Sequence, residues 1–401
     1  MLSVALALAL VLLWLSPDAR GATDIPKIDE NRQGAPYAAG ELLVTYNPGA
    51  FRRHVEQVVG GARVEEEIPA SGTQLLSFPA VRREQRGSIR EEKLRRVKEA
   101  LQKVPGVEHV AYNYLRLPYY SANDPFFKSQ KQWDLARIGA PAAWNKVLGV
   151  GSRVAIVDSG IAGNHPDLKS KIVAQKDLVN NDQVAEDDIE GHGTHVAGTV
   201  GAVTNNARGV AATCPACKLL VAKSGGARGF YDFDIAQGIY WSVNNRAKAI
   251  NLSLGARVDT RILRHAVDYA WDHGVVVVAA AGNDNTSRPN YPAAYEHVIS
   301  VSATDQLNRK ARFSTFGPTV DVAAPGVEIW STVPGGRYDV KAGTSMASPH
   351  VAALAGLLAA QDRQAPQIRR RIQRTATDLG ADGKDGIYGW GLINANRAVR
   401  R

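Results

Sequence analysis

The sequence predicts an α/β protein whose mostly parallel sheet is covered by helices on both faces, preceded by a small α+β unit. From residue 121 onward, apolar segments such as VAIVD, KLLVAK and VVVVAAA alternate with helical stretches. These segments lack the apolar and polar alternation of a half-exposed strand, which indicates strands that are buried on both faces. Residues 41–120 instead hold short elements in the order strand, helix, strand, helix, strand.

The composition is that of a globular protein and excludes a largely disordered chain. Of the 401 residues, 45% are hydrophobic and 22% are charged, which suits one large domain with accessories. The 48 Lys and Arg exceed the 39 Asp and Glu, so the formal net charge is +9. No block of five like charges and no ladder of aromatic and basic residues accompanies this excess. We therefore expect a solvated basic surface and no nucleic-acid partner, with binding of an anionic polymer as the alternative.

The N-terminal segment predicts export. Residues 3–15 form one apolar run of 13 residues, followed by Pro17, Asp18 and a stretch of small residues that ends at Ala22. A helix that spans a bilayer needs about 20 apolar residues, so the run is typical of a signal peptide over residues 1–22. We expect a secreted protein, extracellular or periplasmic, without membrane association once the signal is removed. A short membrane anchor is the alternative, since no Lys or Arg precedes the run.

The order of elements divides the rest into a linker at residues 23–40, a unit at 41–120 and a large domain at 121–401. In the small unit we expect strands at ELLVTY, TQLLSF and VEHVAYNYLRL, and helices at HVEQVVGGA and at residues 91–103. This order predicts a small ferredoxin-like α+β unit with its helices on one face of a sheet. Pro118 and the segment SANDP mark the boundary of the large domain.

The large domain places three polar side chains at the ends of predicted elements. Its expected strands are VAIVD, KLLVAK, AINLSL, VVVVAAA, HVISVSA and VDVAA. Asp158 ends the first of these strands, His192 lies between glycines at the start of a small-residue helix, and Ser345 lies in the first turn of a long apolar helix. Open parallel sheets form their binding sites at the carboxyl ends of the strands, so we expect the site there.

The three residue types are the parts of a nucleophilic triad. A serine hydroxyl is a poor nucleophile until a base removes its proton, and imidazole has a pKa suited to that near neutral pH. A carboxylate orients the imidazole and stabilises its protonated form. Asp158, His192 and Ser345 therefore predict covalent catalysis by serine. The alternative is that Ser345 only caps a helix and that Asp158 is a solvated loop acid.

The motifs around these residues resemble those of the subtilisin-like serine peptidases, the subtilases, over residues 121–398. They are VAIVDSG, HPDL, GHGTHVAGT, NNARGV, NLSLG, VVVVAAAGN, GTSMASPHVA and YGWGLINA, in this order. The resemblance, which is to the thermitase-like subtilases, implies a subtilisin-like fold and a serine endopeptidase that needs no cofactor for catalysis. It implies Asp158, His192 and Ser345 as the triad and Asn283 as the side-chain oxyanion donor. It also implies that residues 41–120 are an inhibitory, chaperone-like propeptide.

The resemblance further implies an extended peptide as substrate. Ser253, Leu254 and Gly255 are expected to line the first specificity pocket and Asn290 to frame it. The segment around Gly229 is expected to pair with the peptide as an antiparallel strand. Hydrogen bonds to a peptide backbone do not depend on its side chains, so we expect broad specificity. No buried acid dedicated to Arg or Lys is visible in these segments, which favours apolar or aromatic residues at the cleaved position.

A structural calcium ion is also implied by the resemblance. Its expected ligands are Asp124, Asp167 of HPDL and Asn206 of NNARGV. These are oxygen donors, which calcium prefers. The alternative is that Asp124 and Asn206 only cap turns.

The two cysteines, Cys214 and Cys217, lie in the segment TCPACK. In an exported chain this spacing favours a small disulfide loop. The alternative is a zinc site made with His192 and His195, which would occupy the expected catalytic base.

These expectations combine into a secreted, monomeric serine endopeptidase that cleaves proteins and peptides. Its own propeptide is expected to inhibit it until the chain cuts itself near residues 119–121. A dedicated processing peptidase is the alternative within this class, and a non-catalytic binding protein on the same fold is the alternative from another class.

Overall fold

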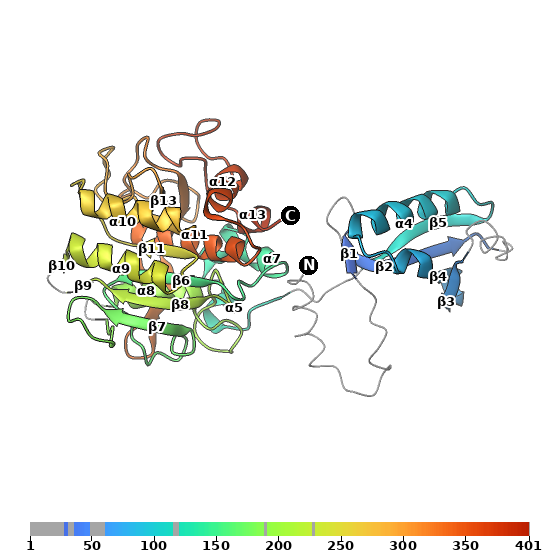
Figure 1. The fold of residues 1–401 in the computed structure, drawn as a ribbon, viewed down its shortest axis with the longest axis horizontal. Coiled ribbons are helices and arrows are strands. Elements are labelled where there is room, and N and C mark those ends of the chain that lie inside the picture. The colour runs from blue at the N-terminus through green and yellow to red at the C-terminus, as the bar shows by residue number, and fades with distance from the viewer. Residues whose placement is uncertain are drawn as a thin grey trace. The chain divides into compact units, whose positions relative to one another are not determined.

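The computed structural model describes residues 28–30, 36–48, 61–114, 120–187, 191–226 and 229–400. The chain divides into two compact units at the bond between Pro118 and Tyr119, and Figure 1 shows the elements of each unit. The predicted signal peptide, most of the helix expected at HVEQVVGGA and one side of the expected cleavage site lie outside the described residues. Within the described ranges, no helix has both the length and the apolar character needed to cross a membrane.

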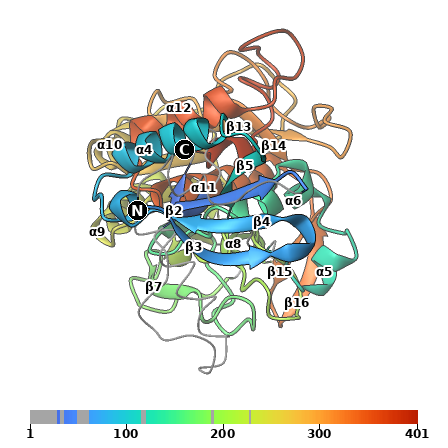
Figure 2. The ribbon, with the colours of Figure 1, turned by 90° about the vertical axis from the view of Figure 1, so that its right-hand side faces the viewer.

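The first unit is an antiparallel sheet with helices. Its strands are β1 (Ile28–Glu30), β2 (Pro36–Tyr46), β3 (Arg63–Ile68), β4 (Thr73–Ser77) and β5 (Val107–Tyr114), in the order β1-β2-β4-β3 with β5 also paired to β2. Its helices are the 3₁₀ turn η1 (Pro69–Ser71), α3 (Pro79–Arg82) and α4 (Gly87–Leu101). Helix α4 packs on β2 and β5 (Figure 2). This arrangement confirms the expected small α+β unit.

The sheet of this unit begins earlier than the sequence predicts. Residues 23–40 were expected to be a linker, yet they contain β1 and the first part of β2. Both β1 and β5 pair with this early part of β2, which extends the strand back from Glu41. The buried guanidinium of Arg90 on α4 also donates to the carboxylate of Asp29 on β1, with Nε and Oδ2 2.7 Å apart. These tertiary contacts, rather than local propensity, make the segment part of the fold.

The core of the first unit follows from the two periodicities of strand and helix. Leu42 and Val44 lie two residues apart on one side of β2 and are fully buried. Leu94 and Leu101 lie two helical turns apart on α4 and are fully buried in the same cluster. The unit therefore has an apolar core of its own.

The second unit is built on a seven-stranded sheet in which all neighbouring strands are parallel. Its order is β14-β13-β12-β11-β6-β8-β7. The strands are β6 (Arg153–Asp158), β7 (Ile172–Asp177), β8 (Lys218–Lys223), β11 (Ala249–Leu252), β12 (Val276–Ala280), β13 (Val298–Thr304) and β14 (Val322–Pro325). The six expected strands are confirmed. The seventh, β7, was not expected because it is an edge strand with the exposed Val173 and polar residues, and so lacks an apolar run.

Helices cover both faces of this sheet. On one side are α8 (His192–Gly201), α11 (Thr344–Ala359) and α12 (Ala365–Thr375), and on the other are α9 (Asp232–Asn244) and α10 (Arg261–Asp272). Figure 1 shows α9 and α10 side by side. Strand β6 illustrates the division: Ile156 packs with the α8 and α11 side, and Val157 packs with the α9 and α10 side. This double burial explains the near-continuous apolar strands.

Short elements complete the second unit. They are α5 (Pro125–Lys128), α6 (Trp133–Arg137), α7 (Ala140–Trp144), α13 (Ala395–Ala398) and two hairpins, β9 (Gly225–Gly226) with β10 (Gly229–Phe230) and β15 (Ile329–Val333) with β16 (Arg337–Lys341). The hairpin strand β15 packs against α8.

The two cysteines form a disulfide, as expected. Cys214 and Cys217 are bonded and fully buried just before β8. A Cβ atom at Gly149 would lie only 2.1 Å from the Cys214 sulfur, so the loop before β6 packs directly on the bond. Because both sulfurs are oxidised, neither is available as a zinc ligand, and the zinc alternative is excluded.

Candidate active site

The parallel sheet brings three of the predicted residues to one edge. Strands β6, β11 and β12 are neighbours and run in the same direction. Asp158 ends β6, Ser253 follows β11 and Asn283 follows β12, so all three lie at the carboxyl ends of adjacent strands. This is the edge at which open α/β sheets bind ligands.

Asp158 and His192 are in direct contact. Asp158 is 1% exposed, and its Oδ1 lies 2.7 Å from Nδ1 of His192, which is the first residue of α8. The same oxygen accepts the backbone N–H of Ser159 at 2.8 Å. The bond assigns the proton of the imidazole to Nδ1, because a carboxylate only accepts. The other ring nitrogen, Nε2, is thereby left as a proton acceptor.

The surroundings raise the pKa of His192 above its ordinary value of 6.5. The main cause is the charge of Asp158, which favours the protonated ring, and the hydrogen bond between them adds to the effect. Burial acts in the opposite direction, since it penalises the charged form. The charge of Asp187 raises the pKa further.

Asp187 is a contributor that the sequence analysis did not identify. Its Oδ1 accepts the hydroxyl of Ser159 at 2.8 Å, and its Oδ2 accepts both the backbone N–H and the hydroxyl of Thr194, at 2.8 and 2.6 Å. It therefore ties the residue after Asp158 to the first turn of α8. In the sequence it is one of several acids in the segment AEDDIE, with no motif to distinguish it.

Ser345 lies opposite this pair at the second position of α11 and is half-buried. Its hydroxyl donates to the carbonyl oxygen of Ser253 at 3.3 Å. In return, the hydroxyl of Ser253 donates to the carbonyl oxygen of Ser345 at 2.8 Å. Among the described residues no hydrogen bond joins Ser345 to His192, whose helix α8 packs against α11. Such catalytic contacts commonly tighten only when substrate binds.

The amide nitrogen of Asn283 and the backbone nitrogen of Ser345 both lie close to Gly343. Oδ1 of Asn283 accepts the backbone N–H and the hydroxyl of Thr344, each at 2.9 Å, which leaves Nδ2 as the outward donor. A Cβ atom built on Gly343 would lie 3.5 Å from this Nδ2 and 3.6 Å from the backbone nitrogen of Ser345. Glycine at 343 thus keeps a small space open between two N–H donors, which suits a developing oxyanion.

The predicted substrate-binding residues are brought together in part. A Cβ atom on Gly255 would lie 2.4 Å from Nδ2 of Asn290, and the next residue, Ala256, exchanges two backbone hydrogen bonds with Tyr291. Leu254 packs beside them, partly buried. The segment 253–255 and Asn290 therefore lie side by side, as one wall of a specificity pocket requires. Gly229 lies in the β9–β10 hairpin, whose neighbours Ala227 and Arg228 fall outside the described residues.

The three residues expected to bind calcium also lie together. Asp124 and Asp167 are both 0% exposed. Asn206 donates through Nδ2 to Oδ1 of Asp167 at 2.7 Å, and the backbone N–H of Asn205 donates to Oδ2 of Asp124 at 2.8 Å. Burial raises the pKa of Asp124, and the nearby charge of Asp167 adds to the rise.

The site formed by Asp124, Asp167 and Asn206 has the oxygen donors that a hard cation such as calcium prefers. Asp124 does not cap α5 with its side chain. It accepts the backbone N–H groups of Asn205 and Asn206 instead, and Oδ1 of Asn206 accepts the N–H of Arg208 at 2.9 Å, so both residues do cap turns of this loop. Over the described ranges, neither Asp124 nor Asp167 forms an ion pair with Lys or Arg. Two buried carboxylates that face the same loop repel each other, and an oxygen-bound cation relieves that repulsion. Among the described residues no group of three or more His, Cys, Asp or Glu side chains is arranged to hold a metal ion, so any site depends on amide and carbonyl oxygens as well.

His195, the second histidine of the motif, does not take part. It is 0% exposed and its Nε2 lies 2.9 Å from the carbonyl oxygen of Ile329. Burial lowers its pKa to about 3, so it stays neutral. It connects α8 to β15.

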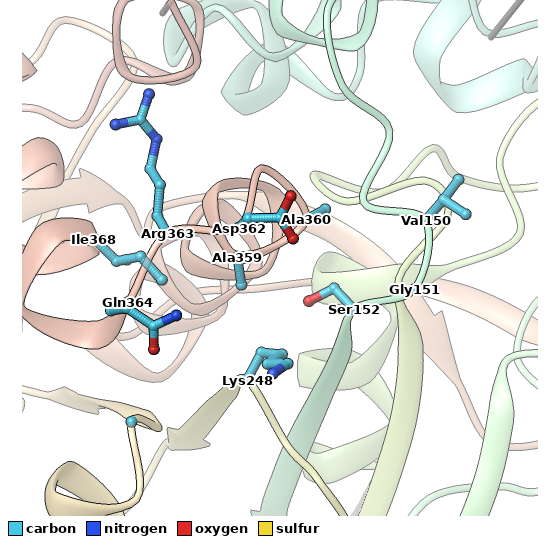
Figure 3. Close-up of a pocket in the computed structure, with 11 residues that line it drawn as sticks. Val150, Gly151, Ser152, Lys248, Ala359, Ala360, Asp362, Arg363, Gln364 and Ile368 are labelled. Carbon is cyan, nitrogen blue, oxygen red and sulfur yellow. The ribbon is translucent and has the colours of Figure 1, made fainter. Parts of the chain in front are cut away.

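A pocket of about 250 Å³ lies at the other end of the strands (Figure 3). It is lined by Ser152 and Lys248, which precede β6 and β11, and by Asp362, Arg363 and Gln364 between α11 and α12. None of the residues predicted for the site reaches it. The candidate active site is therefore the carboxyl edge of the sheet.

Comparison with known proteins decides the family. Residues 149–391 match the Subtilase family, and residues 23–113 match the Fervidolysin N-terminal prodomain. The chain belongs to the subtilase family. It is a subtilisin-like serine endopeptidase preceded by a prodomain. The prodomain match starts at residue 23, which agrees with the early strands β1 and β2.

Individual relatives agree with this assignment. The subtilase is 46% identical over 282 residues to thermitase of Thermoactinomyces vulgaris, covering 70% of this chain and 100% of that protein. It is 38% identical over 372 residues to a thermophilic serine proteinase of Bacillus sp. (strain AK1), covering 91% and 92%. A solved protease from Pseudoalteromonas arctica has a TM-score of 0.65 and 30% identity, covering 70% of this chain and 99% of that one.

The contact between Asp158 and His192 predicts the titration of the imidazole. In the Ser345→Ala protein, which avoids self-digestion, we expect NMR titration to give a His192 pKa above 6.5. A raised pKa keeps the ring protonated to higher pH, so the acid limb of the kcat/KM profile should also lie above that value. Asp158→Asn should lower the pKa, because it removes the opposite charge, and Asp187→Asn should lower it less. An unchanged pKa in Asp158→Asn would contradict this account.

Proposed function

We propose that this subtilase hydrolyses peptide bonds through Asp158, His192, Ser345 and Asn283. The observation that supports it most is the short contact between Asp158 and His192 at the same strand edge as the two N–H donors of Asn283 and Ser345. Nε2 of His192 takes the proton of the Ser345 hydroxyl as its oxygen attacks the scissile carbonyl carbon. Asp158 stabilises the imidazolium that forms.

The negative charge of the tetrahedral intermediate then falls on the former carbonyl oxygen. We propose that Nδ2 of Asn283 and the backbone N–H of Ser345 donate to it, which their common proximity to Gly343 supports. The imidazolium of His192 returns the proton to the leaving amine, and the acyl group remains on Ser345. Water attacks the ester with His192 again as base, which releases the carboxylic acid and restores the serine.

The substrate is proposed to be an extended polypeptide of broad sequence. The segment 253–255 and the hairpin around Gly229 offer backbone groups, which recognise any peptide. Leu254 and the framing Asn290 supply a wall without a buried charge, which favours apolar or aromatic side chains at the cleaved position.

The proposal extends to the export and proteolytic maturation of the chain. Residues 1–22 are proposed to be a signal peptide that directs secretion, residues 23–120 to be the inhibitory propeptide, β1 and the start of β2 included, and residues 121–401 to be the mature monomeric enzyme. The separate core of the first unit supports a role as an independently folding template. A parallel sheet with many non-local contacts folds slowly, so such a template is physically reasonable.

A structural calcium ion is proposed at Asp124, Asp167 and Asn206. When bound, it would neutralise two buried carboxylates and hold the start of the mature enzyme against the Asn206 loop. It takes no part in catalysis.

Covalent labelling tests the nucleophile. A fluorophosphonate should add once to the wild-type protein, because the hydroxyl of Ser345 attacks it as it attacks a carbonyl, and intact-mass measurement should show the single adduct. Ser345→Ala should show none, and Ser242→Ala, which removes a fully buried serine of α9, should still be labelled. A folded wild-type protein that stays unmodified would disprove the assignment.

Expression of the inactive variant tests self-maturation. If the chain cuts itself, Ser345→Ala produced alone in a protease-deficient host should accumulate as a precursor with the first unit still attached. The wild type should appear with an N-terminus near Ser121. Normal processing of Ser345→Ala in that host would show that another protease makes the cut.

Chelation tests the calcium site. An ion that binds only the folded state adds about 2.7 kcal/mol of stability at a hundredfold excess over its Kd. Thermal inactivation of the wild type should therefore be slower in excess calcium than in chelator, and Asp167→Asn should lose most of this difference. Asp382→Asn, at an exposed loop acid, is the control and should behave as the wild type. Equal inactivation rates for the wild type in both buffers would show that no calcium ion at this site stabilises the protein.

A further inference from the structure

Pro349 creates an unusual position in the helix that carries the nucleophile. Helix α11 contains this proline at the residue four positions after Ser345. In an α-helix, the carbonyl of each residue accepts the N–H of the fourth residue onward, and proline has none. The carbonyl of Ser345 therefore cannot form its regular helical bond. A buried carbonyl without a donor is costly, so a replacement is needed.

The replacement donor for the Ser345 carbonyl comes from the residue that follows strand β11. Ser253, which follows β11 and is 5% exposed, donates its hydroxyl to the Ser345 carbonyl oxygen over 2.8 Å. A hydroxyl has one hydrogen, so the single donor of Ser253 is committed to this bond. The hydroxyl of Ser345 donates back to the Ser253 carbonyl oxygen at 3.3 Å. Two reciprocal bonds thus join the nucleophile to the end of β11.

A buried amide orients that hydroxyl. Nδ2 of Asn251 donates to Oγ of Ser253 at 2.8 Å, and Oδ1 of Asn251 accepts the hydroxyl of Ser348 at 2.7 Å. Asn251 and Ser348 are both 0% exposed. Because the amide donates to Ser253, the hydrogen of Ser253 is left to point at Ser345. The direction of the whole chain of bonds, from Ser348 to Ser345, is therefore determined.

We propose that Ser253 and Asn251 are positioning residues that substitute for the missing amide of Pro349 and set the place of Ser345. The position of the nucleophile is then determined by β11, whose following segment forms the wall of the proposed substrate site, and not by its own helix alone. Ser253 thus acts on Ser345 in addition to lining the specificity pocket. The inference rests on the proposed role of Ser345 as nucleophile.

A double-mutant cycle with rescue tests the proposal. Ser253→Ala should lower kcat about tenfold while KM changes little, since a misplaced nucleophile slows chemistry more than binding. Pro349→Ala alone should leave kcat within about twofold, because it adds a donor that the carbonyl already has. Combining the two should restore most of the lost kcat, since the new backbone N–H can donate to the Ser345 carbonyl.

The readout is kcat per active site, counted by titration with a fluorophosphonate. Ser242→Ala is the matched control, because its buried hydroxyl also donates to a helix carbonyl, that of Gly238 at 2.6 Å, without touching Ser345. Its kcat should equal that of the wild type. If Ser253→Ala does not fold, Asn251→Ser with and without Pro349→Ala provides the same comparison.

The outcomes separate this inference from the proposed function. A wild type that cannot be titrated refutes the nucleophile itself. A titratable wild type with an unchanged kcat in Ser253→Ala refutes only the positioning role. A loss that Pro349→Ala does not rescue, or a rise in KM alone, shows that Ser253 acts on the substrate and also refutes it.

Discussion

Burial of the parallel sheet on both faces is the constraint on which the rest of this structure depends. Strand β6 must be apolar on both sides because α8 and α11 cover one side while α9 and α10 cover the other. Polar groups are consequently absent from the middle of the strand and appear where it ends, at Asp158. Strand β12 is likewise apolar and ends before Asn283, while β11 ends before Ser253 and buries one polar side chain, that of Asn251. Because parallel strands end at a common edge, double burial concentrates the chemistry there.

Close packing around α8 is the second requirement, and small residues meet it. A Cβ atom on Gly198 would lie 2.3 Å from the hydroxyl oxygen of Thr332 and 2.4 Å from that of Ser331, so β15 can pack on the helix only at a glycine. Those two hydroxyls donate to the carbonyl oxygens of Thr194 and His195, at 2.7 Å each. His192, the proposed base, is therefore carried on a helix that buried hydrogen bonds hold in place.

The same kind of hydrogen bond, from a hydroxyl to a helix carbonyl, occurs at Ser345, the proposed nucleophile. Ser253 donates to the carbonyl of Ser345 as Ser331 donates to that of His195, and in both cases a strand or its end supplies the hydroxyl. Hydrogen bonds thus join α11 to the end of β11 and α8 to the β15–β16 hairpin. In the first unit a side-chain hydrogen bond also joins a helix to a strand, from Arg90 on α4 to Asp29 on β1, beside the apolar core of Leu42, Leu94 and their neighbours. The two units differ in their sheets, which pair antiparallel strands in the first unit and parallel strands in the second.

The sequence by itself determined the fold class, six of the seven parallel strands, the disulfide and the motif residues Asp158, His192, Ser345 and Asn283. These features are readable because local patterns encode them: continuous apolar runs, glycine-bracketed polar residues and a short cysteine spacing. Only the tertiary structure decided that β1 and β7 complete their sheets and that Asp187 ties Ser159 to α8. It also revealed that the hydroxyl of Ser253 takes the place of an amide that Pro349 lacks, a contact between residues 92 positions apart. Edge strands have little apolar signal, and hydrogen bonds between distant residues leave no local pattern, so neither can be read from the chain alone.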